Sequence, residues 1–419
     1  MSNWLRKAEK RKIKEQDKGI VDFAKSVKHY FKNFRKWINE MMDPRHQSYI
    51  SYSQADLVIL GLLKNICSVE SMNQMEEKFN ENICIHNLKV LSGNEKLKEM
   101  PHYDTLNYYL EQLSPNCLDE LRGKMIRSLI RSKTFNEARI AGGYWRIILD
   151  GTGLFHFKER HCENCLKAVH INEDKSKRID YYHKVLEAKL ILNDKIIVSL
   201  GTEFIENENE DVTKQDCEQN AAKRLLARIK KQYPRLKICI LGDALYAAES
   251  IMQICRNNEW KYILNKNDGN QKNISKDYEY IKAAEDKYYE VNYKLEKGKS
   301  CFVNHVEEVT GKKEIFNVYE YEYTEKGEVH RFMWITNIEV NKRNLEELVA
   351  AGRSRWKIEN EGFNNQKNGI YKIEHLNSRN NNAMKSHYLL TQIADILMQL
   401  YLAGNKMIRK IKQSIKNTS

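Results

Sequence analysis

The sequence predicts an α/β protein with a helical amino-terminal region, and three observations lead to this class. Over roughly the first 140 residues, apolar side chains recur at helical spacing. From Tyr144 onward, short β-rich runs alternate with amphipathic helical segments. Two of these runs lead into an aspartate, Asp150 and Asp243. The chain of 419 residues is long for one domain, so we expect two or three structural units.

The amino-terminal region is expected to be a set of basic and apolar helices. In residues 10–40 the apolar positions recur near helical spacing. The basic positions between them are Lys25, Lys28, Lys32, Arg35 and Lys36. These cations would face either water or phosphate, and the pattern leaves both interpretations open. Residues 57–63 and 106–113 predict further helices with polar caps.

After Tyr144 the sequence predicts strands and helices in alternation. The expected elements are three strands, a helix, a strand, a helix and a strand, at 145–157, 184–192, 195–205, 215–233, 237–242, 247–257 and 260–265. This is the order of a ribonuclease H-like fold, in which the first and fourth strands lie side by side. That adjacency would bring Asp150 and Asp243 together.

An inserted antiparallel β-subdomain is expected at 267–336. Residues 288–293, 302–306, 316–323 and 332–336 are β-like, with polar residues in alternation. The interval between Asp243 and Glu359 is too long for one crossover helix. The aromatic alternation indicates sheet packing rather than a platform for stacking bases.

The helix that carries Glu359 is predicted to begin at Asn344-Leu-Glu-Glu347, a capping-box pattern. Arg355, Glu359 and Phe363 follow one another at intervals of four and would share a face. Arg355 would orient Glu359 or bind a phosphate, and a surface ion pair is the plain alternative. Glu361 would face elsewhere and is the weaker candidate.

Taken together, Asp150, Asp243 and Glu359 indicate metal-dependent chemistry. Each aspartate alone is more often a turn former or helix cap. As a set, the three carboxylates can hold two divalent ions for phosphoryl transfer, which requires the attacking and leaving oxygens to be held together. We expect two Mg²⁺ ions, with Mn²⁺ as a substitute, because hard carboxylates leave room for water and phosphate oxygens. The expected reaction is the cutting and joining of nucleic acid.

These motifs resemble those of a known enzyme family. The segments 150–152, 243–246 and Arg355-Trp-Lys-Ile-Glu359 look like the three blocks of the DDE transposases of bacterial insertion sequences, in the cut-and-paste group with the Tyr-Arg-Glu-Lys signature. The resemblance runs from about residue 143 to about residue 402. It implies that Asp150, Asp243 and Glu359 are the catalytic, metal-binding triad of an endonuclease and strand transferase.

The resemblance also implies DNA contacts by Arg355, Trp356 and Lys367. Gly352 stands where the family has tyrosine, and the family's lysine falls one position late, at Lys367. The implied partners are double-stranded DNA with terminal inverted repeats, target DNA, and a second copy of the chain bound to the DNA ends. The alternatives are a ribonuclease H-like nuclease or resolvase, and a catalytically silent DNA-binding descendant of a transposase.

These interpretations give a domain organisation. Residues 1–142 would be a helical DNA-end-binding region, and 143–266 with 337–402 a ribonuclease H-like catalytic core. Residues 267–336 would be the inserted β-subdomain, and 403–419 a basic tail.

A histidine and cysteine cluster offers a separate metal site. His161, Cys162 and Cys165 are candidate zinc ligands, which His170 or His183 could complete. A single Cys-x-x-Cys without a second pair also fits a reduced turn, which is the preferred interpretation.

The composition fits a DNA-handling protein. With 70 Lys and Arg against 57 Asp and Glu, the formal net charge is +13, which favours a polyanionic partner over an apolar membrane. Nine cysteines, a charged run at 6–12 in place of a signal peptide, and no long apolar stretch lead us to expect a cytoplasmic, nucleoid-associated protein with reduced thiols and no membrane partner.

Overall fold

The chain folds into two compact units. A computed structural model describes residues 7–266, 272–285, 287–294, 296–307 and 315–404. One unit consists of Met1–Thr134 with Asn365–Ser419, and the other of Phe135–Asn364. Residues 365–402, which the sequence analysis assigned to the catalytic core, thus belong to the same compact unit as the amino-terminal helices. The expected basic tail at 403–419 lies almost wholly outside the described residues.

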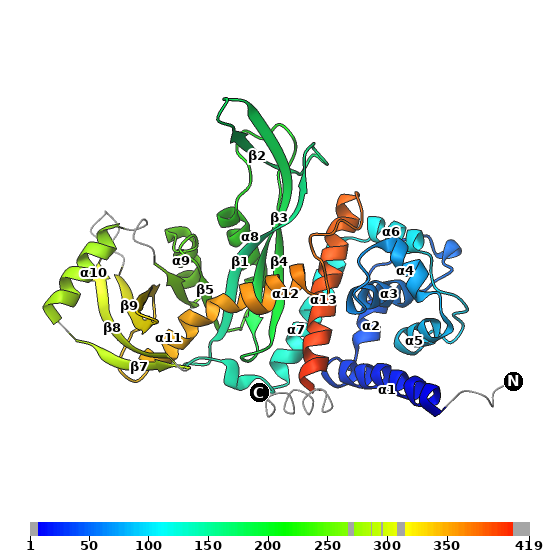
Figure 1. The fold of residues 1–419 in the computed structure, drawn as a ribbon, viewed down its shortest axis with the longest axis horizontal. Helices are drawn as coiled ribbons and strands as arrows, with labels where there is room; N and C mark the ends of the chain where they lie inside the picture. The colour runs from blue at the N-terminus through cyan, green and yellow to red at the C-terminus, as the bar shows by residue number, and fades with distance from the viewer. Residues whose placement is uncertain (1–6, 267–271, 286, 295, 308–314, 405–419) are drawn as a thin grey trace. The chain divides into compact units, whose positions relative to one another are not determined.

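The first unit is helical, as the sequence predicts. Its elements are α1 (Lys7–Tyr30), α2 (Phe34–Asn39), η1 (Gln47–Tyr49), α3 (Gln54–Ile66), α4 (Met72–Phe79), α5 (Asn82–Ser92), α6 (Tyr103–Gln112), α7 (Pro115–Arg131), most of α12 (Asn364–Asn368) and α13 (Asn381–Gly404). The long helix α13 packs against α1, α3, α6 and α7 (Figure 1). The helix expected over 10–40 is interrupted between Tyr30 and Phe34. Phe31 and Phe34, on either side of this turn, are both buried.

The second unit is built on a ten-stranded sheet. The strands are β1 (Trp145–Phe157), β2 (Leu166–Ile171), β3 (Lys177–Ile191), β4 (Ile197–Ile205), β5 (Ile238–Gly242), β6 (Lys261–Asn265), β7 (Tyr289–Tyr293), β8 (Glu296–Glu307), β9 (Ile315–Glu325) and β10 (Glu328–Thr336). Among the described residues their order is β2-β3-β1-β5-β6-β10-β9-β8-β7. Strand β4 lies off this path and pairs with β3 from Lys184 to Ile191. The helices are η2 (Asn136–Ala138), α8 (Glu218–Gln232), α9 (Glu249–Asn257), α10 (Lys272–Glu285), α11 (Leu345–Arg353), η3 (Ser354–Trp356) and η4 (Ile358–Phe363).

The central strands β1, β5 and β6 are parallel. Ile148 of β1 pairs with Leu241 of β5, so the predicted adjacency of these two strands is confirmed. Every residue of β5 is buried, which is typical of a parallel strand covered on both faces. Asp150 and Asp243 each lie two residues beyond the paired Ile148 and Leu241, and therefore at the same edge of the parallel strands.

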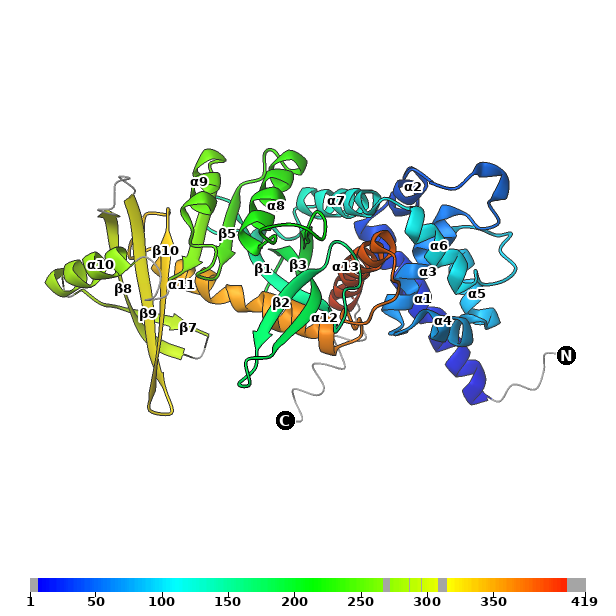
Figure 2. The same cartoon turned by 90° about the horizontal axis from the view of Figure 1, so that it is seen from above.

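Helices cover both faces of these strands (Figure 2). On one face, α8 packs on β3 and β4, and a Cβ at Gly201 would lie 2.9 Å from Leu225. On the other face, Val349 of α11 and Ile358 of η4 belong to one buried cluster with Ile148 and Leu241. The chain before Glu359 is thus anchored over the strands that carry the two aspartates.

Strands β7 to β10 extend the same sheet instead of forming a separate one. Trp334 of β10 pairs with Asn265 at the end of β6 in antiparallel register. The described part of 267–336 is β-rich, as the sequence predicts, but it also contains α10, which the sequence analysis did not predict. This helix packs on β8, and the buried Tyr278 hydroxyl lies 3.1 Å from the Cys301 thiol.

The extension also supports α11. The Tyr319 hydroxyl donates a hydrogen bond to the Leu348 carbonyl at 2.9 Å. Gly352 lies against the Trp334 indole, where an added Cβ would come within 2.5 Å. The Arg353 guanidinium lies 4.1 Å from the centre of the Phe332 ring. The helix that precedes Glu359 therefore rests on β9 and β10.

Candidate active site

Asp150 and Asp243 occupy different local structures. Asp150 lies inside β1, at the point where the pairing with β5 has ended and the pairing with β3 continues. Its carboxylate accepts a hydrogen bond from the Gly151 N–H at 2.9 Å. Asp243 directly follows β5, and its carboxylate accepts a hydrogen bond from the Leu245 N–H at 2.9 Å. Asp243 thus also forms the turn that its sequence position suggested.

Arg355 reaches the first aspartate. Its Nη1 atom lies 3.8 Å from Oδ2 of Asp150, and the two side chains are 11% and 16% exposed. The Nε atom of Arg355 is buried and has no hydrogen-bond partner within the described ranges. The guanidinium lies 4.5 Å from the centre of the Trp356 ring, and Trp356 itself is 47% exposed. This buried Nε atom therefore requires a hydrogen-bond acceptor that the described residues do not supply.

Glu359 lies on a turn of π-helix, where the sequence analysis expected a continuous α-helix. The chain passes from α11 through the 3₁₀ turn η3 into the π turn η4, which contacts β1 and β4. Ile358 and Phe363 are buried in the core cluster, and Glu359 is exposed. Single π turns inside helices occur frequently at functional sites. Glu359 thus stands at the surface of an element that touches the strand carrying Asp150.

The helix starts where the sequence predicts, but the expected capping box is wrong. Asn344 is the N-cap residue and makes no side-chain cap hydrogen bond. Its side-chain oxygen instead accepts from the Asn341 N–H at 2.8 Å. The Glu347 carboxylate accepts from the Ala141 N–H at 2.9 Å, which ties the helix start to the segment before β1.

The electrostatics of the site favour a bound cation. Burial raises the pKa of Asp150 to about 6, and the neighbouring charges of Asp243 and Glu218 add to this effect. Arg355 and the Gly151 N–H act in the opposite direction and do not cancel it. Carboxylates in which burial and neighbouring negative charges disfavour the ionised form are a fitting donor set for divalent ions.

The structure brings the predicted triad together only in part. Among the described residues, no three carboxylates place their oxygens within 4.8 Å of one another, whereas Cys162, Cys165 and His183 do so with their ligand atoms. A site for two ions spreads its ligands over a longer distance than a site for one, because the ions are about 3.5–4 Å apart. Glu359 is therefore linked to the strand of Asp150 only through η4, the element that carries it, which contacts β1.

Glu218, the first residue of α8, is a site residue that the sequence analysis missed. Its carboxylate accepts a hydrogen bond from the Tyr246 hydroxyl at 2.8 Å and pairs with Lys184. It also lies against Gly151, where an added Cβ would come within 2.6 Å of the carboxyl carbon. Glu218 thus contacts the residue after Asp150 and the turn that follows β5. The only sequence signal was an acidic residue in the first turn of a helix, which is common.

We expect Gly151→Ala to displace Glu218 and to destabilise the protein. The added methyl group would overlap the Glu218 carboxyl group, and overpacking of this kind costs about 1–3 kcal/mol. Gly153→Ala is the matched control, because a Cβ there would meet its nearest neighbour, His156, at 3.4 Å. Thermal unfolding measures both variants. Equal unfolding temperatures for the two variants would contradict the contact, and Glu218→Ala should relieve the Gly151→Ala defect in the double variant.

The remaining predicted DNA-contacting residue, Lys367, lies in α12 and belongs to the helical unit. Its ammonium group is 2.8 Å from the Glu374 carboxylate, and its side chain is 26% exposed. The structure therefore does not group it with Arg355 and Trp356. Gly352, at the family's tyrosine position, is held against Trp334, and this packing leaves no room for a side chain.

The structure brings some of the candidate zinc ligands together and separates others. Cys162 and Cys165 meet His183, whereas His170 is half-exposed and lies 3.3 Å from the Asp180 carboxylate. His161 stacks on Phe157 with ring centres 4.4 Å apart.

Two aspartates lie at one edge of the parallel strands, and an arginine lies against the first of them. A glutamate lies on the helical segment that covers these strands. This acidic site is suited to phosphoryl transfer. A family model described as the transposase DDE domain matches residues 142–395, and the chain belongs to this family. It is thus a transposase, a nucleic-acid-processing enzyme of a family that acts on DNA and generally uses divalent metal ions. The sequence matches no curated protein.

The family match confirms the resemblance to DDE transposases, which the sequence analysis placed at about 143 to 402. In the part of the chain that the structure describes, no helix is both long and apolar enough to cross a membrane.

Proposed function

We propose that the protein cuts DNA at the ends of an insertion sequence and joins the freed ends to target DNA, with Asp150, Asp243 and Glu359 as its catalytic, metal-binding residues. The observation that carries the proposal is the placement of Asp150 and Asp243 at one edge of adjacent parallel strands. The element that bears Glu359 contacts β1, the strand of Asp150.

Two Mg²⁺ ions, or Mn²⁺ in their place, suit this donor set. When bound, such ions activate the attacking water or 3′-hydroxyl and stabilise the leaving 3′-oxygen. The three carboxylates would hold the ions, and Arg355 would fix the Asp150 carboxylate while its unpartnered Nε atom would donate to a phosphate oxygen. The exposed indole of Trp356 packs beside the DNA. Glu218 is a positioning residue, because it packs against Gly151 and accepts a hydrogen bond from Tyr246 and would not touch the reacting atoms.

The catalytic unit is proposed to be ribonuclease H-like. In support, β3 lies antiparallel to β1, and β1, β5 and β6 run parallel in that order, with helices on both faces. The proposed organisation is a core of 143–266 and 337–402, an insertion at 267–336 and a basic tail at 403–419, although residues 365–402 lie in the helical compact unit. The Tyr-Arg-Glu-Lys group is the proposed subgroup, with glycine in place of its tyrosine.

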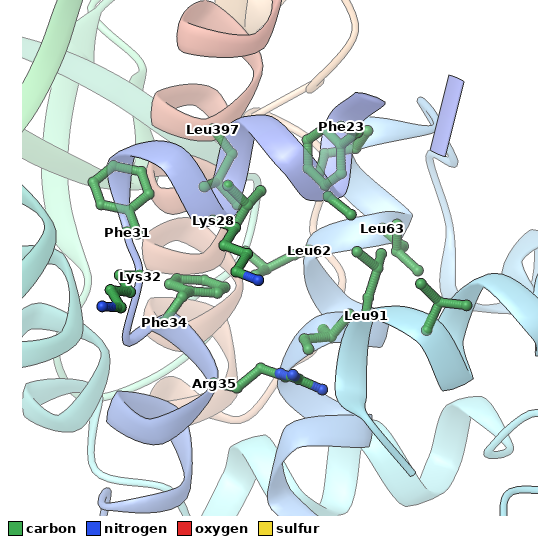
Figure 3. A pocket seen from close by; sticks show the side chains of 15 residues that line it. Phe23, Lys28, Phe31, Lys32, Phe34, Arg35, Leu62, Leu63, Leu91 and Leu397 are labelled. Atoms are coloured by element: carbon green, nitrogen blue, oxygen red, sulfur yellow. The ribbon is translucent and has the colours of Figure 1, made fainter. Parts of the chain in front are cut away.

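Residues 1–142, of which Met1–Thr134 belong to the helical unit, are the proposed DNA-end-binding region. Five basic side chains of α1, α2 and the turn between them are exposed: Lys25, Lys28, Lys32, Arg35 and Lys36. Three of these, Lys28, Lys32 and Arg35, line a pocket of about 210 Å³ whose other walls are largely apolar (Figure 3). Within the described ranges these three form no ion pair, so they are available to phosphates.

The proposed partners are two duplex ends with terminal inverted repeats, target DNA, and a second copy of the chain that bridges the ends in the bacterial nucleoid. The test uses an end-sequence duplex in the presence and absence of Mg²⁺. Cleavage followed by joining to a second duplex supports the transposase. Cleavage without joining would favour a nuclease or resolvase, and binding without cleavage would favour a catalytically silent DNA-binding protein.

Replacing Arg355 with alanine should weaken both DNA binding and cleavage. The guanidinium offers a bidentate fork to phosphate, so Arg355→Lys should restore binding better than cleavage. Loss of one phosphate contact should also reduce the slope of log K for DNA binding against log salt concentration by about one. Gel shifts over a range of salt concentrations and a cleavage assay measure these effects.

Arg353→Ala is the matched control for this experiment. Arg353 is 14% exposed, pairs with Glu296 at 3.3 Å and lies over the Phe332 ring. Its removal should lower the unfolding temperature and leave the salt dependence of DNA binding unchanged. If Arg355→Ala behaved in the same way, its proposed contact with phosphate would be wrong.

A further inference from the structure

A second metal-binding constellation lies in the same unit, beyond the carboxylate site. The thiols of Cys162 and Cys165 are 3.6 Å apart, and Nε2 of His183 lies 3.4 Å from the first and 3.5 Å from the second. Cys165 is fully buried and His183 is 5% exposed. The donor atoms therefore surround one point, although their residues come from the loop after β1 and from β3.

The loop conformation holds the two thiols together. The Cys165 N–H donates to the Cys162 carbonyl at 3.3 Å, which closes a turn over the two intervening residues. The Cys162 N–H in turn points to the Cys165 sulfur at 3.4 Å. The buried Asn207 then fixes the turn from outside, because its side-chain amide donates to the Cys165 carbonyl at 3.0 Å. The arrangement is thus preformed by the backbone.

His183 is placed by the sheet. It faces Phe155 across the β1–β3 pair, so its position follows from the strand register. The candidate fourth donor is His161, the residue before Cys162, whose ring centre lies 6.2 Å from that of His183. It lies outside the group of three ligands whose donor atoms are within 4.8 Å of one another, so its ring would have to move toward the ion on binding.

We propose that Cys162, Cys165 and His183, with His161 as the fourth donor, bind a structural Zn²⁺ ion. Two thiolates and two imidazoles form one of the standard tetrahedral sets of structural zinc, and they are too soft for Mg²⁺. Binding releases the two thiol protons and involves no redox change. Because all four ligands are protein groups, the site has no open position for substrate and does not take part in DNA chemistry.

The ion would fasten the loop after β1 to β3. Strand β2, which directly follows this loop, is bonded to the segment between β4 and α8, since the Gln215 side chain exchanges hydrogen bonds with the Lys167 backbone at 2.6 and 2.9 Å. That segment leads directly to Glu218 at the start of α8. Zinc would thus stabilise the region that leads to Glu218, the residue that packs against Gly151 next to Asp150.

The test begins with the unaltered full-length protein. Elemental analysis after purification should find about one zinc per chain. Exchange of this zinc for Co²⁺ should give the visible absorption of a tetrahedral site together with thiolate-to-cobalt charge-transfer bands. Removal of the metal by a chelator should lower the unfolding temperature, and added Zn²⁺ should restore it.

Paired variants locate the ligands. Cys162→Ser, Cys165→Ser and His183→Asn should each abolish the thiolate-bound cobalt spectrum or weaken zinc binding by more than tenfold. Cys217→Ser and His170→Asn are the controls, since both residues are exposed and neither belongs to the cluster. Unchanged zinc affinity in His161→Asn would overturn the assignment of His161 as the fourth zinc ligand.

Two results would overturn the site as a whole. One is purified protein that contains no zinc and gives no tetrahedral cobalt spectrum. The other is a thiol assay that shows Cys162 and Cys165 joined in a disulfide. Both are measured on the wild-type chain and do not depend on whether a variant folds. The Asp150→Asn protein should keep its zinc, so failure of the proposed DNA chemistry remains distinguishable from failure of this site.

Discussion

Replacing Asp150, Asp243 or Glu359 singly with alanine should abolish Mg²⁺-dependent DNA cleavage and leave DNA binding largely intact. Many lysines and arginines supply the binding free energy by neutralising phosphates, whereas metal ligands act mainly on the transition state. Loss of several kcal/mol of transition-state stabilisation corresponds to a rate decrease of about 10³-fold or more. A gel shift and a cleavage assay on the same duplex measure the two effects separately.

Glu361→Ala is the matched control, because Glu361 lies on the same π turn and is half-buried. It should retain cleavage. Full cleavage by the Glu359→Ala protein would refute the assignment of Glu359, and loss of cleavage in Glu361→Ala would then move the third ligand to that residue. Loss of DNA binding in the Asp150 and Asp243 variants would show that these carboxylates support the fold of the binding surface instead.

The second large effect concerns stability: Asp150→Asn should make the metal-free protein more stable at neutral pH. Burial raises the pKa of Asp150 from 3.8 to about 6, so its charge in the folded state is unfavourable by up to about 3 kcal/mol. The amide has a similar shape and carries no charge. In buffer with a chelator, the unfolding temperature of the variant at pH 7.5 should exceed that of the wild type.

The pH dependence follows from the same raised pKa. Between about pH 4 and pH 6 the unfolded chain loses the Asp150 proton before the folded chain does, so this residue makes the wild type less stable as the pH rises. The stability that the protonated Asp150 carboxyl group gives relative to the charged form is fully present below about pH 4 and is lost above about pH 6. Asp150→Asn should lack this component, and added Mg²⁺ should stabilise the wild type alone. A variant less stable than the wild type at pH 7.5 would contradict the raised pKa.

Much of the catalytic unit follows from local sequence patterns. The expected strand at 145–157 coincides with β1, and the expected helices at 215–233 and 247–257 contain α8 and α9. These segments have strong apolar periodicity because they are covered by other elements. Strand β2 was missed because it lies at an edge, with only Leu166 buried, and so lacks that pattern. Helix α10 was missed because much of its length is polar.

The candidate site was predictable where it depends on strand order. The side-by-side arrangement of Asp150 and Asp243 follows from the order of elements alone. The bracing by Glu218 depends on the absence of a side chain at Gly151, a contact between distant segments that no local pattern reveals. The π turn at Glu359 likewise arises from packing, and strand register decides that His183, and not His170, meets Cys162.

The support of α11 by β9 and β10 bears on how the protein can be divided. The Tyr319 hydrogen bond to the Leu348 carbonyl and the Trp334 ring beneath Gly352 lie under the helix that leads to Glu359. A shortened version that joins residue 266 directly to residue 337 would remove these supports and leave β6 as an unpaired edge. A fragment that keeps the helix leading to Glu359 in place should therefore retain β9 and β10.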